Sequence, residues 1–395
     1  MTAFGAFGIL LSFLSMAIVW RQLTINRLLV CTLLMILHIF AAVDYYQFSL
    51  TAVADSSQYY FDYFHLSTHR FELGTVGLLN LVQVLKSNGA TYLDCFMLFQ
   101  VFGFAGMMIM VRVFQDIEAY VQVPEGRSYL ILLFLPTLNF WTAAIGKDAP
   151  LFFAISLCTF AMLSLRKRLF LFCLSLSVMV LFRAHIALMA ATALAGAAIF
   201  ERSVSTGRKL ALFAFALLGI WFTAGAVQTT FGVDATSVSD VSDFLNTHNG
   251  INATQGGTTA MGDAPIPVRV VSLLFRPLFF DAHGLMGIVP SFENVGVIIA
   301  FIYVIVHWRD VALLARRVFF IRFALFFAFM ILLGLTLIYY NVGLGLRERI
   351  MSFPMIFSLL VALWSMRRKR AAPPVQQMHP SLLVGDNRNR AVPGM

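Results

Sequence analysis

Uninterrupted apolar stretches of membrane-spanning length fill most of this chain, and they limit its fold more than any other feature. A helix needs about 20 apolar residues to cross a bilayer, with a workable range of about 17–25. Only 12% of the residues are charged, whereas soluble domains have about 25%. We therefore predict an all-α, polytopic integral membrane protein with about eleven transmembrane helices, at 4–20, 28–43, 93–111, 128–145, 149–165, 169–182, 184–200, 210–226, 293–308, 318–340 and 350–366.

The few charged residues separate onto two sides of the predicted bundle. Basic runs at Arg166–Arg168, Arg316–Arg317 and Arg367–Arg370 lie at the ends of apolar segments, and such runs hold segment ends in the cytoplasm. This places the N-terminus outside and the C-terminus in the cytoplasm. The formal net charge of +9 therefore reflects membrane topology, and we expect no nucleic-acid partner.

We predict a single transmembrane domain, and we assign the remaining segments to its surfaces. Two stretches are too polar for clean spans and are expected to be interfacial or re-entrant. Proline is expected to interrupt any helix within the second of them at Pro277 and directly after it at Pro290. The tail lacks an apolar period and is expected to be cytoplasmic and disordered. The segments are the domain 1–370, the outward stretches 44–92 and 227–266, the interfacial stretches 71–87 and 267–289, and the tail 371–395.

Arg183 and His185 lie at a predicted turn between two short apolar segments. Both outer ends of these segments are cytoplasmic by the charge rule, so the chain must turn back as a hairpin. Each arm has about 15 residues, or about 22 Å of helix, which is short of a hydrocarbon layer about 30 Å thick. The turn is therefore expected below the outer surface. A charge at that depth is costly, so Arg183 is expected to bind an anionic ligand. The alternatives are that its side chain extends outward to the membrane surface or pairs with Asp148.

Arginines at the outward ends of the predicted spans suggest a site for a diphosphate. Arginine makes forked contacts with phosphate oxygens, and glycines beside the last two of these arginines permit a loose backbone. The alternative is that the arginines pair with nearby acids, which is common in membrane interiors. The arginines are Arg183, Arg276, Arg347 and Arg349, and the acids are Asp281, Glu293 and Glu348.

Carboxylates flanked by aromatic residues form a second candidate site. Asp55 precedes Tyr59 and Tyr60, and Glu72 follows a phenylalanine. Aromatic rings stack on sugars, while a carboxylate accepts hydroxyl protons or acts as a general base. The alternative for Asp55 is a helix cap. Lys147 and Asp148, at the tip of another hairpin, are expected to form an ion pair.

No metal or cofactor is expected. The sequence contains none of the motifs GxxxxGK[ST], HExxH and CxxC, and no outward acid cluster is dense enough for a divalent-metal cage. The four cysteines all fall in apolar segments, which favours buried thiols over disulfides.

The chain resembles bacterial polysaccharide polymerases and related membrane glycosyltransferases of the Wzy- and EpsG-like kind. The similar stretches are Asp55–Tyr60 with Glu72, Pro136–Asp148, Phe182–Ala187, Phe275–Glu293 and Asn341–Pro354. It departs from the family where Ala184 follows Arg183, in place of proline, and where Phe279–Asp281 replaces a Pro-Trp-Glu-like element.

The resemblance implies a multi-pass protein of the bacterial inner membrane with a periplasm-facing site for sugars on undecaprenyl diphosphate. One glycan would move from its lipid carrier to the nonreducing end of another lipid-linked repeat. It further implies that the four arginines hold the diphosphate and that Asp55, Glu72 or His185 deprotonates the acceptor hydroxyl. The implied substrate contacts are Tyr59, Tyr60, Lys147, Asp148, Asp281 and Glu293.

Two other functions stay open at the level of the sequence. One is a transferase that adds a single sugar from a polyprenyl-phosphate donor. The other is a flippase for lipid-linked oligosaccharide, which is disfavoured because transporters commonly contain paired repeats and this chain shows none. For the polymerase, the expected partners are the lipid-linked oligosaccharide, a chain-length regulator and other assembly proteins.

Overall fold

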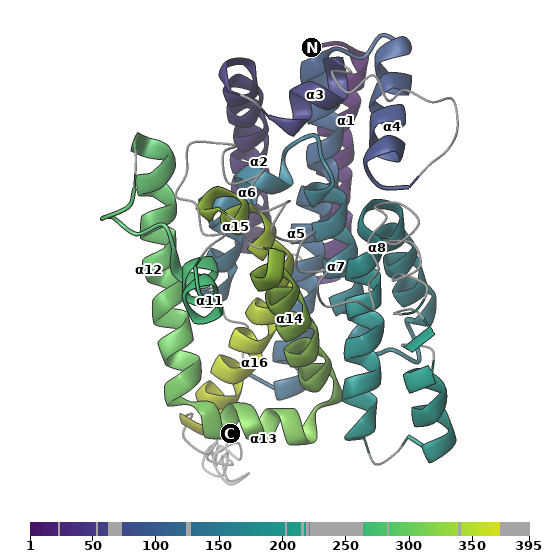
Figure 1. The fold of residues 1–395 in the computed structure, drawn as a ribbon, viewed down its shortest axis with the longest axis vertical. Coiled ribbons are helices and arrows are strands. Elements are labelled where there is room, and N and C mark those ends of the chain that lie inside the picture. Colours follow the sequence, from purple (N-terminus) through teal and green to yellow (C-terminus); the bar gives the residue numbers. More distant parts are fainter. Residues whose placement is uncertain are drawn as a thin grey trace, which may run out of the picture.

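The described part of the chain is made of helices, most of which run along one common axis (Figure 1). The computed structural model describes residues 1–22, 24–52, 54–61, 73–123, 128–201, 204–214, 217–218, 221, 264–282, 284–338 and 341–371. No β-strand occurs among these residues. Glu72, most of the predicted outward segment 227–266 and nearly all of the tail 371–395 lie outside them.

The elements follow the apolar segments of the sequence. They are α1 (Ala3–Ser15), η1 (Met16–Gln22), α2 (Ile25–Thr51), α3 (Asp55–Phe61), α4 (Thr75–Ser87), α5 (Tyr92–Val121), η2 (Ser128–Phe134), α6 (Pro136–Thr142), α7 (Asp148–Met162), α8 (Leu169–Ile199), α11 (Ile266–Phe275), α12 (Gly284–Val306), α13 (Trp308–Arg317), α14 (Phe319–Ile338), α15 (Val342–Glu348), η3 (Arg349–Ser352) and α16 (Phe353–Ala371).

Side-chain caps fix where several of these helices begin. The Thr24 hydroxyl accepts a hydrogen bond from a backbone amide in the first turn of α2. At the start of α5, Thr91 and Asp94 form a reciprocal capping box. The Asn341 side chain accepts from the Leu344 amide, 2.7 Å away, and so begins α15. Each cap satisfies an amide that has no partner inside the helix.

Six helical stretches in the described residues are long and apolar enough to cross a membrane. The fold is therefore that of a polytopic helical membrane protein. The predicted count of eleven spans stays a prediction, because several of the predicted spans correspond to shorter helices. The six stretches are Ile25–Thr51, Tyr92–Val121, Leu169–Ile199, Gly287–Val306, Phe319–Thr336 and Val342–Ala371, and shorter apolar helices occur at Ala3–Val19, Asp148–Met162 and Ile266–Phe275.

The helices differ from the predicted segments at three places. The span at 128–145 is divided into η2 and α6, because Pro136 disfavours a helical conformation at the residue before it. The outward segment 44–92 begins inside a helix, since α2 continues to Thr51. Pro290 does not interrupt a helix but lies inside α12. The neighbouring Ser291 hydroxyl donates to the Gly287 carbonyl of the preceding turn.

The core lies around α5 and α16. The apolar stretch of α5 is 72% buried, and the stretch that runs from α15 through α16 is 78% buried, compared with 22% for the stretches of α8 and α12. The core includes Leu, Ile, Met, Phe and Ala side chains from these helices and from α7, α8 and α14. A second cluster packs α3 and α4 against α2, α5 and the loop before α7. The peripheral helices α8 and α12 therefore present most of their surface to the surroundings.

The two ends of the bundle differ in what covers them. The start of α1 lies with α3 and α4 at one end, called the α3 end here, whereas α13 lies across the opposite end beside the last turn of α16 (Figure 1). Arg316 and Arg317 belong to α13, and the run Arg367–Arg370 pairs with Asp310 of the same helix. Arg168 pairs with Asp116 near the end of α5 that faces α13. The three basic runs thus gather at this α13 end.

The helix α8 consists of two arms that meet at Arg183. The backbone there is non-helical, with φ −149° and ψ 86°. Arg168, just before the first arm, is at the α13 end, and Glu201, just after the second arm, pairs with Arg322 in the first turns of α14 at that same end. The chain therefore turns back at Arg183, the residue at which the sequence predicts a hairpin.

Candidate functional site

Six charged side chains from four separate segments meet between α3 and α15, and we call them the α3-end charge cluster. Arg347 donates to Asp55 across 2.6 Å and to Asp148 across 2.5 Å. Arg183 donates to Glu348 across 2.7 Å and lies 3.4 Å from the second oxygen of Asp148. The members of the cluster are Asp55, Lys147, Asp148, Arg183, Arg347 and Glu348.

Local structure places each of these side chains. Asp55 and Asp148 occupy the first turns of α3 and α7, where a carboxylate is favoured by the positive end of the helix dipole. Arg183 stands at the break of α8. Arg347 and Glu348 end the short helix α15. Every member therefore sits at a helix terminus or a break, so a few helix ends determine the geometry of the cluster.

The cluster is buried on its α7 side and open on its α3 side. The Asp148 side chain is 3% exposed and the Arg183 side chain 14%, whereas the Asp55 side chain is 43% exposed. Buried charges are tolerated only when they are paired, and Asp148 is paired with two arginines. Asp55 is therefore the carboxylate that a ligand from outside can reach first.

Burial alone would raise the pKa of Asp55. The charge of Arg347 and its hydrogen bond outweigh that effect and hold the pKa of the Asp55 carboxyl below its usual value. Asp55 is therefore a weak base while Arg347 contacts it.

Lys147 is the cation of the cluster that has no carboxylate within ion-pairing distance among the described residues. Its ammonium group donates to the Thr75 hydroxyl, 2.6 Å away, at the start of α4. Burial and, to a smaller degree, repulsion by Arg183 lower the pKa of Lys147 to about 8. Lys147 is thus positioned to give its charge to an anion that enters the cluster.

Aromatic side chains border the cluster. The guanidinium of Arg347 lies 5.5 Å from the centre of the Trp141 ring, a distance at which cation–π attraction operates. Tyr59, a residue of α3, is buried. Tyr60 donates to the backbone carbonyl of Ala90 and packs against Tyr92, so it joins α3 to α5.

Arg349 belongs to a different and more deeply buried group. Its side chain is 2% exposed, donates to the Leu274 carbonyl across 2.8 Å and contacts Asn294. The nearest carboxylate, Glu293, lies 3.8 Å away and accepts hydrogen bonds from the backbone amide and hydroxyl of Thr137. This group joins α12 to α6, α11 and η3.

Arg276 and Asp281 form a third, local group. The Arg276 side chain pairs with Asp281, which also accepts from the backbone amide of Leu278. Both residues belong to the short segment between α11 and α12. Their pairing therefore stabilises that segment.

The four arginines predicted to hold one diphosphate are thus divided among three groups. The structure brings together Arg183 and Arg347 with Asp55, Lys147 and Asp148. Arg276 and Arg349 pair elsewhere, with the acids Asp281 and Glu293 that the sequence offered as alternatives. His185 is exposed two residues beyond the break of α8. Lys147 and Asp148 do not form the expected ion pair, because Asp148 pairs with the two arginines instead.

Glu348, which the sequence offers as an alternative partner for an arginine, pairs with Arg183 in the cluster. Two contributors, Trp141 and Thr75, are not predicted from the sequence. The position of Glu348 directly after Arg347 was a usable signal, whereas nothing in the sequence joins Thr75 to Lys147, 72 positions away.

Comparison with known proteins gives no match. No family model, no curated protein and no solved structure matches this chain. Among the residues that the structure describes, no group of three or more His, Cys, Asp or Glu side chains is arranged to hold a metal ion.

Proposed function

We propose that this protein polymerises lipid-linked oligosaccharide repeat units in the biosynthesis of a bacterial surface or exported polysaccharide. One glycan leaves its undecaprenyl diphosphate carrier and is joined to the nonreducing end of another lipid-linked repeat. The observation that carries the proposal is the meeting of Arg183, Arg347 and Lys147 beside a partly exposed carboxylate, Asp55, at one end of a membrane bundle.

The proposal includes an orientation in the bacterial inner membrane. The α13 end carries the basic runs and is assigned to the cytoplasm by the positive-inside rule. The α3 end then faces the periplasm, where undecaprenyl-linked repeats are joined. Eleven crossings, an odd number, agree with the positions of Ala3 and Ala371 at opposite ends of the bundle (Figure 1).

The chemistry proposed for the cluster is a displacement at the anomeric carbon. The acceptor hydroxyl forms the new glycosidic bond as the bond to the carrier diphosphate breaks, and the hydroxyl proton passes to a base. Arg347, Arg183 and Lys147 stabilise the charge that develops on the departing diphosphate, as fixed cations do best in a site that excludes water. No metal is needed for that stabilisation in this proposal.

Asp55 is the best-placed base because it is both exposed and inside the cluster. In the resting protein it contacts Arg347, which holds its pKa low. A diphosphate that takes over Arg347 releases Asp55 and brings negative charge close to it, and both effects raise the pKa of a carboxylate. The arrival of the donor thereby turns Asp55 into a stronger base.

The test is the size profile of the glycan in a strain whose gene is deleted and then restored as wild type, Arg347→Gln or Arg183→Gln. We expect long polymer only with the wild type, and accumulation of single lipid-linked repeats in the other strains. The matched control is Arg367→Gln, which removes an arginine from an exposed pair at the α13 end and should leave chain length normal.

Immunoblotting of membranes shows whether each variant is inserted at the normal level. Arg347→Lys, which keeps the charge but not the forked geometry, serves where Arg347→Gln is depleted. Polymer of normal length with both arginines replaced would overturn the proposal. A polymer of normal length that lacks one sugar in the deletion strain would favour the single-sugar transferase instead.

A further inference from the structure

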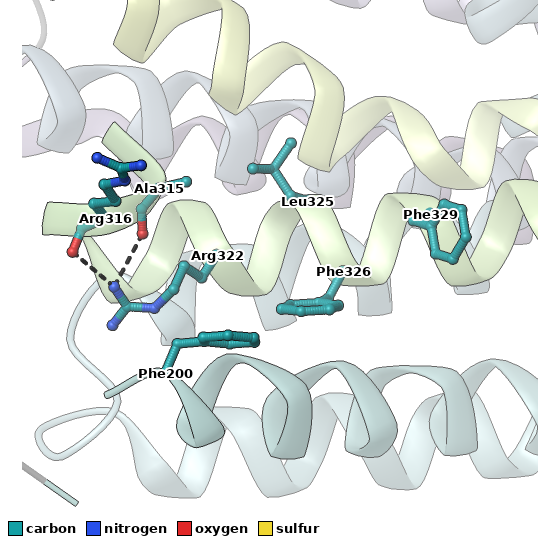
Figure 2. A pocket seen from close by; sticks show the side chains of 7 residues that line it. All are labelled: Phe200, Ala315, Arg316, Arg322, Leu325, Phe326 and Phe329. Carbon is teal, nitrogen blue, oxygen red and sulfur yellow. Dashed lines mark hydrogen bonds between the residues drawn. The ribbon is translucent and has the colours of Figure 1, made fainter. Parts of the chain in front are cut away.

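A cavity of about 800 Å³ lies at the α13 end, far from the α3-end charge cluster. It opens between the end of α8, the end of α13 and the first half of α14 (Figure 2). Its volume falls within the range of about 300–1,000 Å³ that small-molecule sites occupy. Its lining combines the apolar side chains of Phe200, Leu325, Phe326 and Phe329 with Arg316 and Arg322.

Arg322 gives the cavity a fixed cationic wall. Figure 2 shows its guanidinium between the carbonyls of Ala315 and Arg316, to which it donates across 2.9 and 3.1 Å. It also pairs with Glu201. The residue is 7% exposed, and its Nε–H, which is buried, has no hydrogen-bond partner among the described residues. A buried donor without a partner is costly, so an anionic acceptor nearby is favoured.

Arg316 adds a second cation to the lining, and Arg317 follows it at the C-terminal end of α13. Both are exposed, and neither makes an ion pair within the part of the chain that the structure describes. Arg208 and Lys209 approach the same end, where the Lys209 ammonium group caps the Ile199 carbonyl of α8. The basic side chains near the mouth of the cavity therefore exceed the single acid there, Glu201, and the mouth of the cavity attracts anions.

The apolar wall is suited to a hydrocarbon chain. The rings of Phe200 and Phe326 are stacked, with centroids 6.1 Å apart. Phe200 and Phe329 are 65% and 57% exposed. Phe200 lies at the C-terminal end of α8 and Phe329 lies within α14, and both helices are long and apolar enough to span the membrane. A water-soluble anion would gain nothing from these side chains, whereas an acyl chain would bury them.

We propose that this cavity binds an anionic glycerophospholipid of the membrane. The phosphate lies beside Arg322 and Arg316, and one acyl chain lies along Phe200, Phe326 and Phe329 between α8 and α14. Basic side chains at the membrane surface attract anionic lipid headgroups, and guanidinium groups bind phosphate oxygens in a forked manner. This site is distinct from the proposed polymerase site, and it stands whether or not that function is correct.

The experiment is native mass spectrometry of the full-length, delipidated protein in detergent. It is titrated with phosphatidylglycerol and with phosphatidylcholine of the same acyl chains. We expect phosphatidylglycerol to bind at least about fivefold more tightly than phosphatidylcholine. One unpaired cation at the membrane surface contributes about 1 kcal/mol to the binding of an anionic lipid, which corresponds to this factor. Arg316→Gln should abolish that preference. The matched control is Arg309→Gln, an exposed arginine of the same helix that does not line the cavity.

Two further measurements separate the contributions of the headgroup and of the acyl chains to binding. Glycerol phosphate, which has the headgroup charge without the chains, should not compete at equal concentration. Phe326→Ala should weaken both lipids by a similar factor. Equal affinity for the two lipids, or an equal loss of preference in Arg309→Gln and Arg316→Gln, would overturn the site, because the protein would then attract lipids only by its general surface charge.

Discussion

Replacing Asp148 by asparagine should loosen the α3-end charge cluster more than any other single change there. Asp148 is 3% exposed and joins Arg347, 2.5 Å away, to Arg183, 3.4 Å away. Removal of one partner from a buried ion pair costs about 3–5 kcal/mol. Both arginines keep a second carboxylate, so we expect the lower limit, about 3 kcal/mol. This free energy corresponds to a roughly hundredfold increase in the equilibrium constant for opening of the cluster, because about 1.4 kcal/mol is a factor of ten.

A thiol in the same helix provides the assay. Cys158 of α7 is fully buried, and a maleimide can reach it only when α7 opens. With the other three cysteines replaced by serine, the rate of modification follows the opening equilibrium whenever closing is faster than reaction. We expect Asp148→Asn to accelerate modification of Cys158 about a hundredfold, by the free energy estimated above.

The matched control is Asp310→Asn, which removes a carboxylate that pairs with exposed arginines at the α13 end. Surface pairs contribute little, so this change should accelerate modification less than about fivefold. If Asp148→Asn and Asp310→Asn had the same small effect, the buried pairs would not hold α7 in place, and the reasoning would fail.

Three other outcomes are expected. Gly103→Ala should lower the thermal stability of the detergent-solubilised protein strongly, because the new Cβ would lie 2.2 Å from a backbone carbonyl oxygen of α6, whereas Gly296→Ala, with open space, should not; equal melting temperatures would contradict this close contact. In the polymerase assay, donor affinity should fall as the pH rises through about 8, where Lys147 loses its charge, and Lys147→Arg should remove this fall. The acidic limb of kcat/KM should lie at lower pH than that of kcat, because Arg347 holds the pKa of Asp55 down only before the diphosphate binds; coincident limbs would exclude Asp55 as the base.

The outline of the fold could be predicted because apolar length and the placement of cations act locally along the chain. The turn at Arg183 could be predicted because the two arms are short and the positive-inside rule assigns both of their outer ends to the same side of the membrane. Helix lengths were less predictable, because a charged residue does not always end a span. In α5 the helix continues past Arg112 because Asp116 pairs with it one turn later, and α2 likewise continues past Asp44.

The partners within the candidate site could not be predicted in the same way. Asp148 contacts arginines 35 and 199 positions away, and Asp55 contacts one 292 positions away. Only the packing of α3, α7, α8 and α15 determines these choices. The separation of Arg347 from Arg349 was foreseeable, since residues two apart on a helix are about 200° apart around its axis. The glycines beside them made a looser backbone an attractive alternative.

The turn at Arg183 has a consequence for how this chain can change during evolution. A loop absorbs added or lost residues, but α8 reverses at one residue, and the carbonyl of Leu181 just before it accepts a hydrogen bond from the Gly74 amide. One residue inserted in the first arm would rotate Arg183 by about 100° and shift it by about 1.5 Å along the axis. Arg183 would then lose contact with Asp148 and Glu348. This arm should therefore accept exchanges among apolar residues far more readily than an insertion or a deletion.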